Sequence, residues 1–394
     1  MNNLEKILKQ EKLMLPCYNN KNIVDLIRCV YNKVGCNYNK NYNIEYLDKI
    51  IPNNNHLLFI LSDGTGSNLI DKLEKDSILK INKKMDLLTV FPSTTGCVLT
   101  SIVTATYPEE HGIWGWFNYN KKLNIDYYPV LFLDRKNKKS LLDYNINTND
   151  IFKSSSVLKK LDTKVNVLFP TTINNSVYSK FVIDDDNRHP YSNFSDIVEF
   201  MENNCLKNTK SYTYLYIPDV DSIEHENGVD SKKTLTKLKE IDNLVKELSK
   251  NKNLTIVFTA DHGQTNINKD IILDFEKYSK YFYAYPSIDC GTASYYIKKE
   301  YYDDFVNEFN KDFKDEMFLF KKDEFIDKKM FGIGNISKYA RDNLGEFISI
   351  CKKGSYLINS PNTSEYFGKI KGCHSGLSHD EMIIPLIIID TNKL

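Results

Sequence analysis

Six side chains of the kinds that bind metal ions lie at or just beyond the ends of predicted β-strands. They are Asp63, Asp221, His225, Asp261, His262 and His374. Carboxylate oxygen and imidazole nitrogen together suit zinc or manganese better than calcium, and the absence of thiolates favours a catalytic over a structural zinc site. Six such ligands are enough for two ions. The pattern therefore predicts a site for two divalent metal ions, with zinc preferred and manganese as the alternative.

The segment TIVFTADHGQ, residues 255–264, shows the pattern in its simplest form. β-Branched and aromatic residues run directly into Asp261, His262 and Gly263. In DSIEH, Asp221 and His225 are four residues apart, so that one turn of helix places both on the same side. Any one of these residues alone is as readily an ordinary loop residue or a helix cap. Six of them at the ends of different strands indicate one shared site.

Short apolar runs alternate along the chain with amphipathic segments, which is typical of a mostly parallel sheet with helices on its faces. The clearest runs cover residues 56–61, 165–169, 212–217, 254–259 and 382–389. Between the third and fourth runs, one helical stripe is formed by Leu235, Leu238, Ile241, Val245 and Leu248. In open α/β sheets the carboxyl ends of the strands line the ligand crevice, so we expect the six ligand-type residues to meet there.

The sequence changes character after the fourth strand. Residues 271–370 consist of aromatic and charged segments, and roughly a hundred residues are too many for a plain connecting loop. We therefore expect a smaller inserted α+β cap domain at 271–370, a catalytic core formed by 51–270 and 371–394, and an N-terminal helical lead-in at 1–50. Within the lead-in, Ile23, Leu26, Ile27 and Val30 are expected to face inward.

Composition narrows the possible partners. The 52 basic and 52 acidic residues cancel, which argues against binding to a nucleic acid polymer or an anionic membrane. No apolar run approaches membrane-spanning length, and the N-terminus lacks the apolar core of a signal peptide. The eight cysteines are scattered without a CxxC pair, so we expect reduced thiols and a cytoplasmic location.

Five motifs in order carry a resemblance to a known family: FILSDGTG, FPSTTGCVLTSIVTATYPEEHGI, PDVDSIEHENG, VFTADHGQ and GCHSGLSHDEMIIPL. They resemble the alkaline phosphatase superfamily, and within it the nucleotide pyrophosphatase/phosphodiesterase (type I phosphodiesterase) branch. The resemblance implies a doubly wound sheet with two metal ions, usually zinc, at its carboxyl edge. It also implies hydrolysis of phosphodiester or pyrophosphate bonds in small nucleotide-like substrates. One ion would be held by Asp63, Asp261, His262 and the nucleophile, and the other by Asp221, His225 and His374.

The resemblance places the nucleophile on Thr95, with Thr94 and Ser93 as competing assignments. A hydroxyl at a helix N-terminus beside a dication loses its proton more easily, and the helix end also favours the phosphate. The implied reaction is a two-step in-line displacement through a covalent phospho-threonine. Without metal ligands nearby, the residue would be read simply as an N-cap threonine.

Two departures from the family pattern concern the substrate. The phosphodiesterases place an aromatic residue directly after the nucleophile, where this chain has Gly96. They also place an asparagine five residues after the histidine of their HG pair, and counting from His111 this chain has Trp116 there. Asn118 lies two residues further on and would serve only if the loop is bent differently. Trp114 and Trp116 are expected to offer aromatic surface to a base or an apolar leaving group, with core packing as the alternative.

Four other functions compete with phosphodiester hydrolysis. A phosphomonoesterase would need a further cation for the terminal phosphate oxygens, and the sequence identifies none. A phosphomutase would use a serine and a larger inserted domain, and a sulfatase would need a modifiable cysteine in a CxPSR-like setting. A catalytically inactive metal-binding interaction protein should have lost a ligand or the nucleophile, and none is missing.

Overall fold

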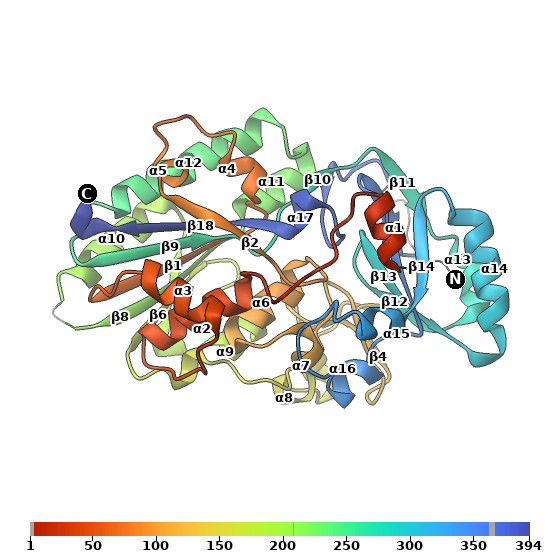
Figure 1. Ribbon diagram of the computed structural model, residues 1–394. Helices are drawn as coiled ribbons and strands as arrows, with labels where there is room; N and C mark the ends of the chain where they lie inside the picture. The colour runs from red at the N-terminus through yellow and green to blue at the C-terminus, as the bar shows by residue number, and fades with distance from the viewer. Residues whose placement is uncertain (1–3, 208, 362–366) are drawn as a thin grey trace.

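A seven-stranded sheet forms the centre of the computed structural model, which describes residues 4–207, 209–361 and 367–394 (Figure 1). In spatial order its strands are β2 (Lys83–Leu88), β18 (Ile383–Asp390), β9 (Leu254–Thr259), β1 (His56–Ser62), β8 (Ser211–Ile217), β6 (Lys164–Pro170) and β7 (Arg188–Tyr191). Neighbouring strands from β9 to β7 are parallel, and β18 runs antiparallel to both β9 and β2. The predicted mostly parallel sheet is confirmed.

The sequence missed β2 and β7, and the reason is their place at the two edges of the sheet. β2 contains three charged residues among its six, and only its last two residues are buried. β7 has four residues and contains Pro190, which removes a backbone donor. Neither strand therefore has the continuous apolar run that marked the five central ones.

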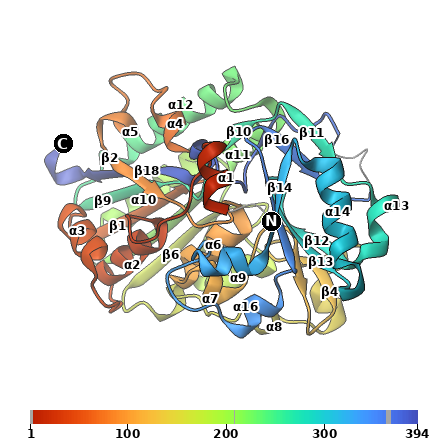
Figure 2. The same cartoon turned by 45° about the vertical axis from the view of Figure 1, so that its right-hand side comes forward.

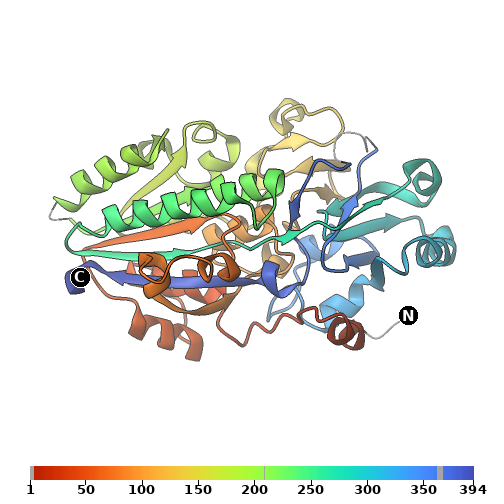
Figure 3. The same ribbon diagram turned by 90° about the horizontal axis from the view of Figure 1, so that it is seen from above.

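Helices cover both faces of the sheet, as the doubly wound fold requires (Figures 1 and 3). Along β1, Leu57, Phe59 and Leu61 belong to one hydrophobic cluster, whereas Leu58 and Ile60 belong to another. The first cluster includes α2 (Ile23–Lys33), α3 (Tyr42–Ile50), α6 (Thr95–Thr104) and α9 (Val177–Val182). The second includes α4 (Ser67–Ile70), α10 (Phe194–Cys205), α11 (Asp219–Asn227) and α12 (Lys232–Leu248). Both faces of the strands are thus buried.

Between β9 and β18 the chain builds a second, four-stranded antiparallel sheet (Figure 2). Its order is β12 (Phe282–Ile288), β13 (Thr292–Ile297), β15 (Phe347–Cys351) and β14 (Met317–Lys321), and α14 (Tyr302–Phe313) packs beside it. β11 (Lys269–Ile272) pairs with β16 (Ser355–Ile358) next to this sheet. An α+β unit therefore occupies the region where the sequence changes character.

The predicted division into lead-in, core and cap remains a prediction, because one hydrophobic cluster crosses these boundaries. It joins α2 and α6 to Phe320, Phe325 and Ile348 of the insert. The first helix, α1 (Leu4–Gln10), lies against the insert, where Lys328 pairs with Glu5 at 2.6 Å. The N-terminal segment thus bridges the two sheets. The four lead-in residues predicted to face inward on α2 are all fully buried.

Short elements complete the chain. They are α5 (Ile78–Ile81), α7 (Pro108–His111), β3 (Asn118–Asn120), β4 (Ile125–Tyr128), β5 (Leu133–Asp134), α8 (Thr148–Ile151), β10 (Thr265–Asn266), α13 (Phe275–Tyr278), α15 (Lys322–Asp327), α16 (Lys338–Asp342), β17 (Gly372–Cys373) and α17 (His379–Met382). β10 pairs with β17, and this pairing brings the segment after His262 beside the segment before His374.

The helix α12 allows a direct test of the packing. Leu238 is fully buried, whereas Leu235, which the sequence assigned to the same stripe, is only partly buried. We expect Leu238→Ala to lower the free energy of unfolding by about 2–5 kcal/mol because it leaves a cavity. The matched Leu235→Ala change should cost only about 1 kcal/mol. Urea denaturation of both variants would measure the difference, and equal losses would contradict this placement of the helix.

Candidate functional site

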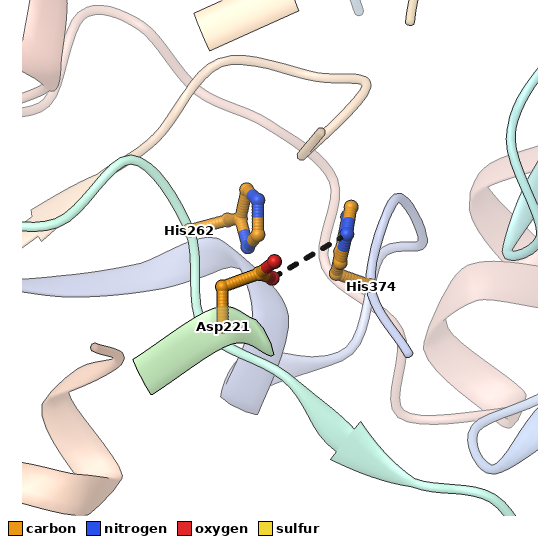
Figure 4. Close-up of side chains that lie close together, drawn as sticks. All are labelled: Asp221, His262 and His374. Atoms are coloured by element: carbon orange, nitrogen blue, oxygen red, sulfur yellow. Dashed lines mark ion pairs between the residues drawn. The ribbon is translucent and has the colours of Figure 1, made fainter. Parts of the chain in front are cut away.

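The structure brings all six predicted ligand residues together at the carboxyl edge of the central sheet. Asp63, Asp261 and His262 form one group whose ligand atoms lie within 4.8 Å of one another, and Asp221, His262 and His374 form a second. Figure 4 shows this second group, with Asp221 on α11 and the two histidines on separate loops. His225 Nε2 lies 3.3 Å from Asp221 Oδ1. His262 therefore lies between the two groups.

The three histidines share one orientation. In each ring Nδ1 faces a backbone carbonyl: Gly372 O for His225 at 2.9 Å, Gly263 O for His262 at 3.1 Å and Ser93 O for His374 at 3.1 Å. A carbonyl oxygen accepts a hydrogen bond from Nδ1–H, so a neutral ring in this orientation has its lone pair on Nε2. Nε2 is therefore the nitrogen through which each of these rings would bind a cation.

The carboxylates of Asp63 and Asp261 are fully buried, and each keeps one oxygen without a hydrogen-bond partner among the described residues, Asp63 Oδ1 and Asp261 Oδ2. Their other oxygens are held: Tyr216 donates to Asp63 Oδ2, and the backbone amide of Gly64 donates to Asp261 Oδ1 at 3.1 Å. Burial raises the pKa of both carboxyl groups. The charges of Asp261 and Asp221 raise that of Asp63 further, whereas His262 partly offsets the rise at Asp261. Two unpartnered buried oxygens with such unfavourable charge fit a divalent cation.

Asp221 and His225 form an ion pair at the outer side of the site. Burial opposes both charges, but the charge of Asp221 and its hydrogen bond raise the pKa of His225 to about 9. Despite its burial, the same pairing lowers the pKa of the Asp221 carboxyl. Gln264 also donates to the Asp221 side chain. Sequence reasoning missed both Tyr216 and Gln264, although Gln264 directly follows the ADHG motif.

Two glycines let the ligand loops approach one another closely. Gly64 has φ +73°, and a Cβ there would lie 2.8 Å from Asp221 Cα. A Cβ on Gly263 would lie 2.1 Å from the carbonyl oxygen of Asp380. The strand β9 can therefore present Asp261 and His262 at its end only because the next residue has no side chain.

The hydroxyl groups of residues 93–95 point to three different partners. Thr95 Oγ1 lies 3.2 Å from His262 Nε2, Thr94 donates to Asp289 Oδ2 at 2.8 Å, and Ser93 donates to the carbonyl of Gly376 at 2.9 Å. Thr95 is the first residue of α6, and the Thr94 side chain makes no capping bond to the helix. Of the three, only Thr95 directs its hydroxyl toward one of the six ligand-type residues, His262.

A pocket of about 310 Å³ opens beside Thr95. It is lined by Thr95, Trp116, Phe117, Asp221, His225, Asp289, Cys290, Tyr356, Leu357, Ile358, Asn359, Ser360, Ile370 and His374. Most of the later members come from the insert. The wall thus combines two aromatic rings from the segment after His111 with side chains that the sequence could not assign.

The structure separates the three residues predicted to contact substrate. Trp116 lines the pocket. Trp114 is fully buried and its ring lies 4.8 Å from that of Phe331, so its contact is core packing. Asn118 is 2% exposed, accepts from the Trp114 amide and donates to the Gly115 carbonyl, and therefore closes the turn that presents Trp116. The substrate contacts predicted for Trp114 and Asn118 have no support in this geometry.

His111, which has the residue type of a ligand, has a structural role. It is fully buried, with Nε2 2.9 Å from Ser101 Oγ and with Nδ1 accepting from the amide of Ile113 at 3.1 Å. Burial lowers its pKa to about 3, so it is neutral. Cys97 and Cys373 are buried free thiols outside both ligand groups.

A sequence model of the type I phosphodiesterase / nucleotide pyrophosphatase family matches residues 57–376. The chain belongs to this family. The match begins in β1 and ends just after His374, and so includes all six ligand-type residues and Thr95. Membership in the alkaline phosphatase superfamily, which the five motifs predicted, is confirmed.

Similar proteins agree with this family. The chain is 26% identical over 132 residues to the mouse ectonucleotide pyrophosphatase/phosphodiesterase family member 7, a match that spans 30% of that protein's length. Murine ectonucleotide pyrophosphatase/phosphodiesterase 5 has the same fold, with a TM-score of 0.64, 17% identity and coverage of 84% of this chain and 87% of that one. Phosphonoacetate hydrolase from Sinorhizobium meliloti 1021 also has this fold, with a TM-score of 0.62, 13% identity and coverage of 86% of this chain and 91% of that one. Across the described residues, no helix is both long and apolar enough to cross a membrane.

Metal binding at the site can be tested with a pair of aspartates on one helix. Asp221 faces the histidines, whereas Asp219 on the same helix pairs with Lys237 at 3.5 Å. We expect Asp221→Asn to weaken binding of one divalent ion roughly 100-fold or more, because it removes a charged ligand. Elemental analysis of dialysed protein would measure the loss as about one ion per chain.

The control is Asp219→Asn, which should keep the metal content of the unchanged protein. Circular dichroism would establish that both variants are folded. A full complement of ions in Asp221→Asn, or no bound metal in the unchanged protein, would contradict the assignment.

Proposed function

We propose that this protein is a two-metal phosphoric ester hydrolase that cleaves phosphodiester or pyrophosphate bonds of small nucleotide-like substrates through a covalent phospho-threonine on Thr95. The observation that carries the proposal is the position of the Thr95 hydroxyl. It lies at the N-terminus of α6 and 3.2 Å from Nε2 of His262, the residue that belongs to both groups of ligand-type residues. Family membership supports the same class of reaction.

In this proposal Asp63, Asp261, His262 and Thr95 hold one ion, and Asp221, His225 and His374 hold the other. The mixed oxygen and nitrogen donor set without thiolate favours zinc over manganese. When bound, such ions lower the pKa of coordinated hydroxyl groups and stabilise negative charge on phosphoryl oxygens. Two features support this assignment: the two buried carboxylate oxygens without a hydrogen-bond partner among the described residues, and the three histidine rings whose Nδ1 atoms face backbone carbonyls.

The proposed reaction is an in-line displacement at phosphorus, in which Thr95 and the start of α6 have separate roles. Thr95 Oγ1 forms a bond to phosphorus and gives up its proton to water, and the bond from phosphorus to the leaving oxygen breaks on the opposite side, so that the leaving group departs with that oxygen. Because Thr94 does not cap α6, the first amide groups of that helix are available to the phosphoryl oxygens. Water then attacks the phosphorus of the phospho-threonine, the bond from phosphorus to Oγ1 breaks, the phosphate product leaves and Oγ1 takes up a proton again.

The pocket supports a substrate with one apolar or aromatic group next to the phosphate. Trp116, Phe117 and Tyr356 supply ring surface on which a base could stack. Murine ectonucleotide pyrophosphatase/phosphodiesterase 5 has been solved as an inactive threonine-to-alanine variant in complex with AMP, at a TM-score of 0.63 and 16% identity. In the present chain Trp116 is the proposed substrate contact, whereas Trp114 and Asn118 are not part of the pocket lining.

A phosphodiester is favoured over a phosphomonoester because of the charge around the pocket. Among its described lining residues there is no lysine or arginine, and two are aspartates. A monoester carries a second negative charge that such a wall does not neutralise. A phosphomutase and an inactive interaction protein remain less favoured, since a threonine occupies the nucleophile position and all six ligand-type residues are present.

The insert acts as a cap in this proposal. It contributes Asp289, Cys290, Tyr356 and Asn359 to the pocket, and so would determine which substrates fit. The cytoplasmic location stays a prediction that rests on the eight cysteines, all of which are free thiols.

Replacing the nucleophile gives a direct test. We expect Thr95→Ala to lower kcat by several orders of magnitude, because no covalent intermediate can form. Thr95→Ser should recover part of the activity, since it keeps the hydroxyl. Stopped-time assays with a nitrophenyl nucleotide diester and elemental analysis on the same samples would measure turnover and metal content.

The matched control is Thr94→Val, because the hydroxyl of Thr94 faces Asp289 rather than the ligand groups. Near-normal turnover in Thr95→Ala together with loss of turnover in Thr94→Val would move the nucleophile by one residue.

The charge of the preferred substrate is a second test of the function. We expect a higher kcat/KM for a nitrophenyl nucleotide diester than for nitrophenyl phosphate, by roughly tenfold or more, because contacts to the nucleoside are used in the transition state. Both substrates release the same chromophore, so one preparation can be assayed side by side. A clear preference for the monoester would replace phosphodiesterase by phosphomonoesterase while leaving the metal chemistry in place.

A further inference from the structure

An acidic side chain of the insert reaches the catalytic pocket. Asp289 lies in the tight turn between β12 and β13, where its own amide donates to Thr292 O at 3.0 Å. Its partly exposed carboxylate lines the same pocket as Thr95, His225 and His374. The proposed reaction assigns no role to this group. The question is what a fixed negative charge does beside a phosphoryl site.

The turn that carries Asp289 is anchored to both of its neighbouring loops. Ile288 exchanges backbone hydrogen bonds with Phe117 at 2.8 and 2.9 Å, and the amide of Gly291 donates to Ser375 Oγ at 2.8 Å. A Cβ on Gly291 would lie 2.7 Å from His374 O. Ile288 has φ +79°, which is strained for a β-branched residue and persists only where the surroundings enforce it. The position of the turn is therefore fixed against the ligand loop.

The carboxylate itself is also fixed. Oδ2 accepts from Thr94 Oγ1 at 2.8 Å, and Oδ1 accepts from the amide of Cys290 at 2.9 Å. Through this contact Thr94 is turned away from the end of α6, whose N-cap side chain makes no capping bond. Asp289 thus stands directly beside the residue that precedes the proposed nucleophile, and it cannot swing away without losing both bonds.

Two histidines of the proposed metal groups act on the charge of this carboxylate. Burial raises the pKa of the Asp289 carboxyl, whereas the hydrogen bond from Thr94 and the charges of His225 and His262 lower it. Asp221 is the other acidic member of the described pocket lining. The guanidinium of Arg135 lies 3.8 Å from the Phe117 ring and donates to Pro286 O and to Asn359, so it supports the wall behind the ring.

We propose that Asp289 is a specificity-determining residue, which selects substrates with a singly charged phosphate and rejects dianionic phosphate by like-charge repulsion. This inference rests on the proposed function and names the group that sets its substrate class. A phosphodiester brings one negative charge to the site. A phosphomonoester at neutral pH brings close to two, and the second would face the Asp289 carboxylate.

Removing the charge while keeping the shape tests the inference. We expect Asp289→Asn to raise the ratio of kcat/KM for nitrophenyl phosphate to kcat/KM for the nitrophenyl nucleotide diester by about tenfold, as for one like-charge contact in a partly shielded site. The ratio is used because a general loss of activity or of folded protein affects both substrates equally. Elemental analysis should find the same metal content as in the unchanged protein.

The matched control is Thr94→Val, which breaks the same hydrogen bond but leaves the carboxylate charged. It should keep the ratio of the unchanged protein within about twofold, whatever happens to its absolute rates. Asp289→Ser, which also removes the charge, replaces the asparagine variant if that one does not fold.

The outcomes separate two failures. If the unchanged protein is active and the ratio stays constant in Asp289→Asn or Asp289→Ser, the role of Asp289 is wrong and the proposed function stands. An equal rise in Thr94→Val would also overturn it, because loss of the hydrogen bond would then explain the effect. If the unchanged, metal-loaded protein hydrolyses neither substrate, the proposed function fails and this inference fails with it.

Discussion

The buried carboxylates of Asp63 and Asp261 are the constraint on which the rest of the site depends. Both are fully buried, both have a raised pKa, and each leaves one oxygen without a hydrogen-bond partner in the described structure. Such a pair is unfavourable unless positive charge is brought between them. The neighbouring histidine rings present Nε2 toward this region because backbone carbonyls hold their Nδ1 atoms. The geometry is that of a site prepared for divalent cations.

Backbone contacts between distant loops set this geometry. The carbonyl of Ser93 accepts from Ser375 N at 2.8 Å and also faces His374 Nδ1, so that the segment before α6 and the loop of the last ligand are joined. The amide of Asp221 donates to Asp63 O at 3.2 Å. Small residues at 64 and 263 allow these approaches. A hydroxyl at the start of α6 is therefore positioned by the same contacts that position the ligands.

The insert contributes side chains to the pocket beside Thr95. Its β12–β13 turn carries Asp289, and its hydrophobic residues Phe320, Phe325 and Ile348 share a cluster with the helices of the central sheet. Packing of Ile288 and these residues in the shared cluster fixes the turn beside the pocket. A charge-based selection of substrate needs the turn to stay in place, because a turn that moved away from the pocket would relieve the repulsion.

The sequence by itself determined the fold class, the family and the set of ligand-type residues. Buried parallel strands are continuous apolar runs, and a side chain at a strand end is fixed in space by the sheet. Edge strands β2 and β7 escaped detection because only part of each is buried. The sequence favoured Thr95 as the nucleophile and kept Ser93 and Thr94 as competing assignments, because the partners of three adjacent hydroxyls are not visible in a sequence. Only the tertiary structure separated them, gave Trp114 to the core and Trp116 to the pocket, and brought Asp289 to Thr94 across 195 positions of the chain. Such contacts depend on how loops from separate elements meet, and local sequence patterns carry no record of that.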